Sequence, residues 1–348
     1  MSAIKNLKKA KFPSELRYDI VSKDWILIAT GRARRPESFK HETRTRKEAP
    51  KKDCPFCNIE TQEKPTLIFI NGKKYPVGKE IPKNWTVITI PNKFPAFAQS
   101  NSLNEKTEGP YKSIDGVGFH EIIVTKDHRK QMAQFSVDQI KEVIDVYHER
   151  YLELMNEKFV HYISIFHNHG PEAGASIFHP HSQLITLPVI DPDLQSSLTG
   201  SQNFLQKQQK CVHCTMLEWE KKERKRIIFE NEDFLVLVPF ASRVAFETRI
   251  YPKEHHAYFE RITEPQKHNL AQAFKVALDK LYKGLGNPPY NFFLHTAPCD
   301  GKNYDHYHWH WEILPKTAIW AGFELGAGIE ISTIEPEKAA EYLRKISI

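Results

Sequence analysis

The stretch Phe178-His179-Pro180-His181-Ser182-Gln183 places two histidines two residues apart around a proline, directly after a glycine-containing turn. In extended backbone, residues i and i+2 point to the same face, so both imidazoles can enter one site. The proline fixes its own φ and favours extended geometry in the residue before it. A metal ion bound to one imidazole would leave the other free as a nucleophile. The stretch therefore predicts covalent catalysis by a histidine that lies beside a metal site.

The same order of elements occurs twice along the 348 residues. Each copy contains C-x-x-C, strand-like runs, a histidine at a strand end, a helix, a further strand and His-x-His. The helices begin at the capping boxes Ser136–Gln139 and Thr263–Gln266. The single histidine precedes the histidine pair by 51 residues in one copy and by 53 in the other. We therefore predict an α+β fold of two fused half-domains, 1–195 and 196–348, each an antiparallel sheet with one long helix, joined near Gln195–Lys210.

Each copy also supplies four side chains that suit a metal ion. Two cysteines, the histidine at the strand end and the first histidine of the pair form the closed tetrahedral set that zinc prefers. Four protein ligands leave no position for an activated water, so we predict one or two zinc ions with a structural role. The ligands are Cys54, Cys57, His128 and His179 at the first site, and Cys211, Cys214, His255 and His308 at the second, with His295 or His310 as alternatives to His308.

A C-x-x-C pair can also be a thioredoxin-like redox pair. That chemistry needs the pair at a helix N-terminus in a βαβ unit, and we expect neither pair in this setting. The fifth cysteine, Cys299, has no partner at such spacing.

The bulk composition favours a cytoplasmic protein that acts on small phosphorylated compounds. No run approaches a membrane span of about 18 apolar residues, and the lysine-rich N-terminus lacks the apolar core of a signal peptide. Net charge is +6. The basic runs carry no interleaved aromatic residues, which argues against a nucleic-acid surface, whereas positive charge suits a phosphorylated substrate.

His181 is the predicted nucleophile, since His179 is assigned to the metal. A neutral imidazole attacks phosphorus well at pH 7. Glycines in the preceding turn allow the backbone to approach a phosphate closely. The arginine cluster 32–35 offers fork-shaped donors for a diphosphate, although the cluster taken alone is better explained as a solvated loop. The polar groups available to a phosphorylated ligand are Ser176, Gln183, Asn168, Gly170, Arg32 and Arg35.

The second His-x-His reads His308-Trp309-His310-Trp311-Glu312 and lacks the proline and the following Ser-Gln. We expect its tryptophans to leave little room for a phosphate. The second half is therefore predicted to be a degenerate, structural copy.

Over nearly its whole length the chain resembles galactose-1-phosphate uridylyltransferases and their relatives, the nucleotidyltransferase branch of the histidine-triad superfamily. The resemblance implies that His181 attacks the α-phosphorus of a nucleotide sugar such as UDP-glucose. Sugar 1-phosphate leaves, and an incoming hexose 1-phosphate then displaces the covalent nucleotidyl-histidine in a ping-pong cycle. It also implies a homodimer with sites at the subunit interface. The residues that it places at the phosphates, nucleotide or sugar are Ser176, Gln183, Asn168, Gly170, Asn92, Arg32, Arg35 and Glu324.

Three departures from the family pattern leave the donor and the hexose open. Ser182 replaces a common glycine, the second C-x-x-C is retained, and Glu330 replaces an expected glutamine. The first two resemble a subgroup of ADP-sugar phosphorylases, which would use ADP-sugar as donor and phosphate as acceptor.

Two readings of other classes remain: a non-catalytic zinc protein that binds nucleotides or nucleic acid, and a nucleotide hydrolase. Gln183 disfavours hydrolysis, because hydrolases of the superfamily carry a histidine there and glutamine cannot act as a general acid.

Overall fold

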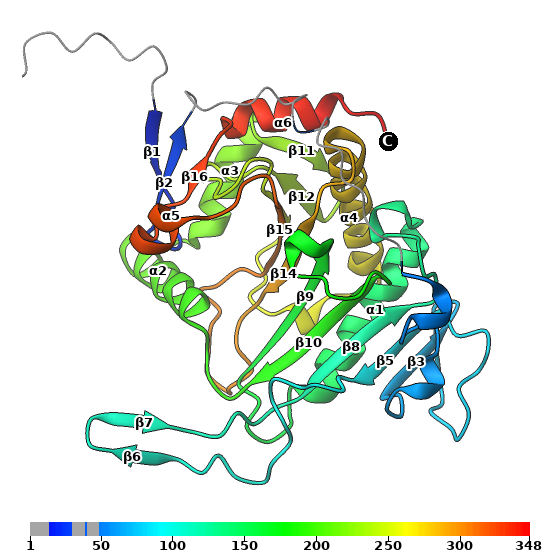
Figure 1. The fold of residues 1–348 in the computed structure, drawn as a ribbon. Helices are drawn as coiled ribbons and strands as arrows, with labels where there is room; N and C mark the ends of the chain where they lie inside the picture. The colour runs from blue at the N-terminus through cyan, green and yellow to red at the C-terminus, as the bar shows by residue number, and fades with distance from the viewer. Residues whose placement is uncertain (1–13, 30–38, 40–48) are drawn as a thin grey trace, which may run out of the picture.

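The computed structural model describes residues 14–29, 39 and 49–348. An antiparallel sheet of eleven strands crosses the molecule (Figure 1). Its order is β11 (Ile227–Glu230), β12 (Phe234–Leu237), β13 (Thr248–Pro252), β15 (His310–Pro315), β14 (Tyr290–His295), β9 (Tyr162–His169), β10 (His181–Leu187), β8 (His120–Thr125), β5 (Val87–Pro91), β3 (Leu67–Ile70) and β4 (Lys73–Tyr75).

The two halves of the chain meet in the middle of this sheet. Strand β9 of the first half pairs with β14 of the second, so that Asn168 lies opposite Asn291 and His167 opposite Phe292. From each outer side inwards the order is the same, β3-β5-β8-β10-β9 in one half and β11-β12-β13-β15-β14 in the other. The predicted repeat is therefore present, but as one continuous sheet, because pairing β9 with β14 covers an edge that each half would otherwise expose.

Two long helices, α1 (Val137–Leu154) and α4 (Glu264–Leu285), pack against each other and against the sheet. Both predicted capping boxes are formed, with Ser136 Oγ accepting from the Gln139 N–H at 3.2 Å. Apolar side chains of both helices and of the sheet make one buried cluster, which includes Leu184 of β10. Side chains alternate along a strand, so His181 and Gln183 project from the opposite face.

The segment that joins the halves is a helix, α2 (Pro192–Gln208). Asp191 accepts a hydrogen bond from the Leu194 N–H at 2.9 Å and caps it, and Pro192 occupies its first turn, where proline is tolerated. Leu194 and Leu198 are buried at helical spacing. Because most residues of this segment are polar, the sequence did not reveal this short apolar stripe.

Smaller elements surround the sheet. Strands β1 (Ser14–Tyr18), β2 (Trp25–Ala29) and β16 (Ile331–Ser332) form a second sheet, and β6 (Lys106–Glu108) pairs with β7 (Tyr111–Ser113) in a projecting hairpin (Figure 1). None of the helices in the described ranges combines the length and apolar character that a bilayer crossing requires. The remaining helices are α3 (Val212–Glu223), α5 (Gly322–Ala327) and α6 (Pro336–Lys345), with short 3-10 turns at Lys51–Asp53, Ile59–Thr61, Met132–Gln134, Pro171–Ala173 and Phe259–Arg261.

The contact of α2 with the β1–β2 turn gives a test of this arrangement. A Cβ atom at Gly200 would lie 1.9 Å from the backbone oxygen of Val21. Alanine normally stabilises a helix relative to glycine, but here we expect Gly200→Ala to lower the free energy of unfolding by about 1–3 kcal/mol through overpacking. Chemical denaturation measures the change.

Gly326→Ala on α5 is the matched control, because no atom lies within 4 Å of its added Cβ. It should leave stability unchanged or raise it slightly. A Gly200→Ala protein as stable as the control would show that α2 does not pack on Val21.

Candidate active site

His181 begins strand β10 and is only 8% exposed. Its Nδ1–H donates a hydrogen bond to the backbone carbonyl of His179 at 2.9 Å, which leaves the lone pair on Nε2. Burial lowers the pKa of His181 below its usual value, although that carbonyl acts in the opposite direction. The ring is therefore neutral, and its Nε2 can act as a nucleophile.

Two amides share the face of His181. Gln183 lies two residues along β10, and Asn168 lies on β9, one step beyond the pairing of His167 with Ser182. Asn168 is held in place because its Oδ1 accepts a hydrogen bond from Asn291 Nδ2 at 2.8 Å. The sheet thus sets two hydrogen-bonding side chains on the same face as the His181 imidazole.

The glycine turn before β10 lines a cavity of about 160 Å³. Gly170 and Gly174 adopt φ values of 89° and 85°, a region that residues with a side chain rarely enter. Asn168, Gly170 and Ser176 line this cavity, whereas His181 and Gln183 lie outside its lining. Asn168 therefore connects the turn with the face that carries His181.

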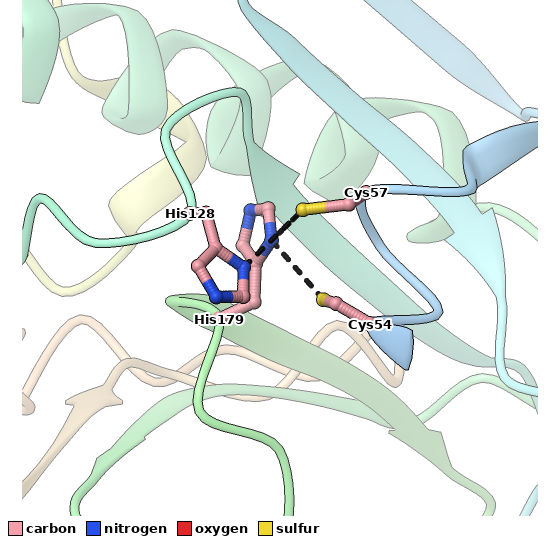
Figure 2. A group of neighbouring side chains, drawn as sticks. All are labelled: Cys54, Cys57, His128 and His179. Carbon is pink, nitrogen blue, oxygen red and sulfur yellow. Dashed lines mark hydrogen bonds between the residues drawn. The ribbon is translucent and has the colours of Figure 1, made fainter. Parts of the chain in front are cut away.

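Cys54, Cys57, His128 and His179 converge, with ligand atoms all within 4.8 Å of one another (Figure 2). The Nδ1 atom of His128 lies 3.2 Å from the Cys57 sulfur, and Nδ1 of His179 lies 3.5 Å from the Cys54 sulfur. Phe56, between the two cysteines, packs on His181, with ring centroids 5.0 Å apart. These four side chains could hold a metal ion directly beside His181.

A second group in the other half has the same composition. Cys211, Cys214, His255 and His308 also bring their ligand atoms within 4.8 Å of one another. His308, not His310, turns its Nδ1 towards Cys214, at 3.6 Å. The His-x-His pairs of the two halves thus have the same arrangement.

The outer nitrogen of each of the four imidazoles in these clusters donates to a backbone carbonyl. These hydrogen bonds fix the tautomer with the lone pair on Nδ1, the arrangement typical of metal-binding histidines. The Nε2 atoms of His128, His179, His255 and His308 donate to Ala49, Thr125, Asp305 and Pro252 at 2.8, 2.7, 2.7 and 2.9 Å, respectively.

One part of the expectation about the cysteines was wrong. Cys211 is the N-cap residue of α3, so the second C-x-x-C pair does lie at a helix N-terminus. Two imidazoles complete its surroundings, and the strands of the main sheet are antiparallel rather than arranged in βαβ units. The donor set therefore still favours a metal ion over thiol exchange.

Comparison with known proteins agrees with this geometry. Residues 5–190 match the N-terminal domain of galactose-1-phosphate uridyl transferase, and residues 198–347 match the C-terminal domain. The chain belongs to this family.

Relatives within the family include two kinds of enzyme. An ADP-glucose phosphorylase of Arabidopsis thaliana is 30% identical over 339 residues, which cover 96% of this chain and 93% of the relative. A galactose-1-phosphate uridylyltransferase of Thermotoga maritima is 28% identical over 344 residues, covering 96% and 99%. The crystal structure of an Arabidopsis thaliana ADP-glucose phosphorylase with bound ADP-glucose aligns with a TM-score of 0.79 at 27% identity, over 97% of this chain and all of that one.

Other residues predicted to bind substrate lie in different places. Arg32 and Arg35 lie outside the described residues. Glu324 is on α5, which lies beside β16 and away from β10 (Figure 1), and its carboxylate accepts from the Ala321 N–H at 3.1 Å. Asn92 contacts His120, which in turn contacts Gln183.

His120 was not predicted as a site residue. It is the first residue of β8, and its Nε2 lies 2.8 Å from Oε1 of Gln183. The sequence did contain one signal for a site residue here, because His120 begins an apolar strand that leads to Asp127-His128. Only the pairing of β8 with β10, however, shows which side chain it meets.

The second half of this family member has a cavity where none was expected. His310 matches His181 and donates its Nδ1–H to the His308 carbonyl at 3.1 Å. A space of about 320 Å³ lies in front of it. The expectation that Trp309 and Trp311 fill this space was wrong, because both rings are buried in the core.

Charge, rather than bulk, distinguishes this second cavity from the His181 site. Glu312 takes the position of Gln183 and forms ion pairs with Arg243 and Arg249. Burial alone would raise the pKa of Glu312, but these guanidinium groups outweigh it and hold the pKa well below its usual value. The whole lining of the cavity carries five carboxylates against these two guanidinium groups, and this excess of negative charge disfavours a phosphate; the carboxylates are those of Asp19, Asp24, Asp193, Glu312 and Glu330.

The first cluster makes a prediction about metal content. Cys54→Ser should remove about one bound metal ion per chain and lower the melting temperature, because binding of a structural metal contributes to the free energy of folding. Elemental analysis and thermal denaturation measure the two effects.

Cys299→Ser is the control, since Cys299 belongs to neither cluster and its thiol lies 3.7 Å from the Val160 carbonyl oxygen. It should keep the full metal content. Equal metal content in Cys54→Ser and Cys299→Ser would rule out the first ligand set.

Proposed function

We propose that this protein transfers a nucleoside monophosphate from a nucleotide sugar through a covalent nucleotidyl-His181. The observation that carries the proposal is the hydrogen bond from His181 Nδ1–H to the His179 carbonyl, which leaves Nε2 unprotonated. In the first step Nε2 forms a bond to the α-phosphorus, and the bond from phosphorus to the sugar-phosphate oxygen breaks. In the second step an incoming phosphate oxygen attacks the same phosphorus, and the N–P bond breaks.

The neighbouring groups suit these steps. The N–H groups of Gln183 and the hydroxyl of Ser176 can donate to phosphoryl oxygens, and Asn168 and the backbone at Gly170 can position the nucleotide. The amides of Gln183 and Asn168 can donate hydrogen bonds but cannot act as acids that transfer a proton. A sugar 1-phosphate needs less proton assistance than a poor leaving group, so glutamine is compatible with transfer.

For the donor we propose UDP-glucose first, with a hexose 1-phosphate such as galactose 1-phosphate as acceptor. The Thermotoga maritima uridylyltransferase, 28% identical over nearly its whole length, supports this choice.

A second candidate is an ADP-sugar phosphorylase, with ADP-glucose as donor and phosphate as acceptor. The relative at 30% identity is an ADP-glucose phosphorylase, and the complete second Cys/His cluster fits the subgroup to which the sequence is similar. The same nucleophile serves both reactions.

We further propose that both Cys/His clusters bind zinc and that neither ion takes part in the chemistry. A set of two sulfur and two nitrogen ligands suits zinc and leaves no open position. The first ion would act on catalysis through position only, since it would hold His179, whose carbonyl orients His181.

A homodimer in the cytoplasm completes the proposal. Glu324 lies on an element remote from β10 in its own chain, so a role at the sugar would require the partner subunit to supply it. The cytoplasmic setting rests on cysteines that are unpaired and spaced for metal rather than for disulfides.

Intact-mass spectrometry after mixing with UDP-glucose or ADP-glucose, without acceptor, tests the mechanism. We expect a mass gain of one UMP or one AMP, discharged by galactose 1-phosphate or by phosphate, respectively. His181→Asn should abolish the gain, because asparagine offers no nucleophilic nitrogen, while metal content stays unchanged.

His310→Asn is the matched control in the second half, and its labelling should persist. Absence of a gain with either donor, in protein that contains its metals, would favour a non-catalytic binding protein. A gain that disappears without acceptor would indicate hydrolysis.

A further inference from the structure

The imidazole of His120 lies against the amide that we place at the phosphate. Strand β8 pairs with β10 so that His120 lies opposite Ile185, on the face that carries Gln183. The His120 Nε2 atom approaches Gln183 Oε1 to 2.8 Å. The ring does not contact His181 directly, and any effect on the reaction would therefore pass through Gln183.

The backbone determines which nitrogen of His120 carries the proton. The Ala96 N–H can only donate, and it lies 3.0 Å from His120 Nδ1. Nδ1 is therefore the acceptor, and in the neutral ring the proton is on Nε2. The Nε2–H group then donates to Oε1 of Gln183.

Asn92 packs on the same ring. Its Oδ1 accepts from the Phe94 N–H at 2.9 Å, which turns its Nδ2 towards the imidazole. That nitrogen lies 3.0 Å from Nε2 of His120 and 3.5 Å from Nδ1, so it touches the ring beside both nitrogens. Because the Ala96 N–H already makes Nδ1 the acceptor, the Asn92 NH₂ group meets Nε2–H at 3.0 Å, and Asn92 does not determine the tautomer.

The orientation of the Gln183 amide follows. With Oε1 occupied by the His120 N–H, the NH₂ group is the end that remains for a ligand. The reversed amide would set N–H against N–H at 2.8 Å and would offer a phosphate its carbonyl oxygen, an acceptor that repels it. One orientation therefore supports phosphoryl transfer and the other opposes it.

We propose that His120 is a positioning residue, which selects the amide orientation of Gln183 so that two N–H donors face the phosphoryl oxygens while His181 attacks. This assignment rests on the proposed function. It extends the site to the chain of groups from the Ala96 backbone through His120 to Gln183.

The test measures the rate at which His181 becomes nucleotidylated. Rapid mixing and intact-mass spectrometry give this rate, with whichever donor labels the unaltered protein. His120→Phe keeps a ring but loses the donor, and we expect a rate about 10- to 100-fold lower, the usual loss when a supporting hydrogen bond to a functional group is removed. Donor concentration at half-maximal rate should change much less. His120→Gln, whose amide nitrogen reaches as far as Nε2, should restore most of the rate.

Coupling to Gln183 separates positioning from a merely structural role. In a Gln183→Ala background, His120→Phe should have no further effect, because the group it orients is gone. An equal loss in both backgrounds, or failure of His120→Gln to restore the rate, would overturn the proposal.

Two further outcomes are distinguishable. If the unaltered protein forms no adduct, the proposed function fails first, and this inference fails with it. If His120→Phe does not fold, as judged by metal content and circular dichroism, His120→Asn replaces it, because its shorter amide stops short of Gln183. A normal rate in that variant would also refute the assignment.

Discussion

The backbone carbonyl of His179 is the atom on which the arrangement of the site depends. The side chain of the same residue turns Nδ1 towards Cys54 and anchors Nε2 on the Thr125 carbonyl. Its own carbonyl receives the Nδ1–H of His181. One residue therefore fixes the position, tautomer and free nitrogen of the His181 ring, and the extended geometry around Pro180 makes this possible.

The second half forms the same hydrogen bond from an imidazole to a backbone carbonyl, but different side chains surround it. His308 and His310 repeat the hydrogen bond from imidazole to carbonyl, at 3.1 Å. The difference lies two residues further along, where Glu312 is fixed as a carboxylate by ion pairs with Arg243 and Arg249, while Gln183 stays neutral. The sheet supplies the geometry in both halves, and the halves differ in whether a neutral amide, Gln183, or a carboxylate, Glu312, follows the second histidine of the pair.

Much of the site could be predicted because local patterns determine it. The spacing of C-x-x-C, single histidine and His-x-His identified all eight cluster residues, and two capping boxes located the long helices. Features that depend on the register between strands could not be predicted from the sequence. The sequence does not show that β8 sets His120 beside Gln183, nor that Trp311 turns into the core. The helix α2 was hidden by its polar composition, and the arginines at 32 and 35 lie outside the described residues.

The pairing of β9 with β14 has a consequence for how such a chain can change in evolution. In the order of the sheet, the innermost strand of each half, β9 or β14, pairs with the innermost strand of the other half. A first half on its own would expose β9 as an open edge, which invites aggregation. The site side chains of either half could therefore change more freely than its innermost strand. Each half is a permanent cover for the open edge of the other.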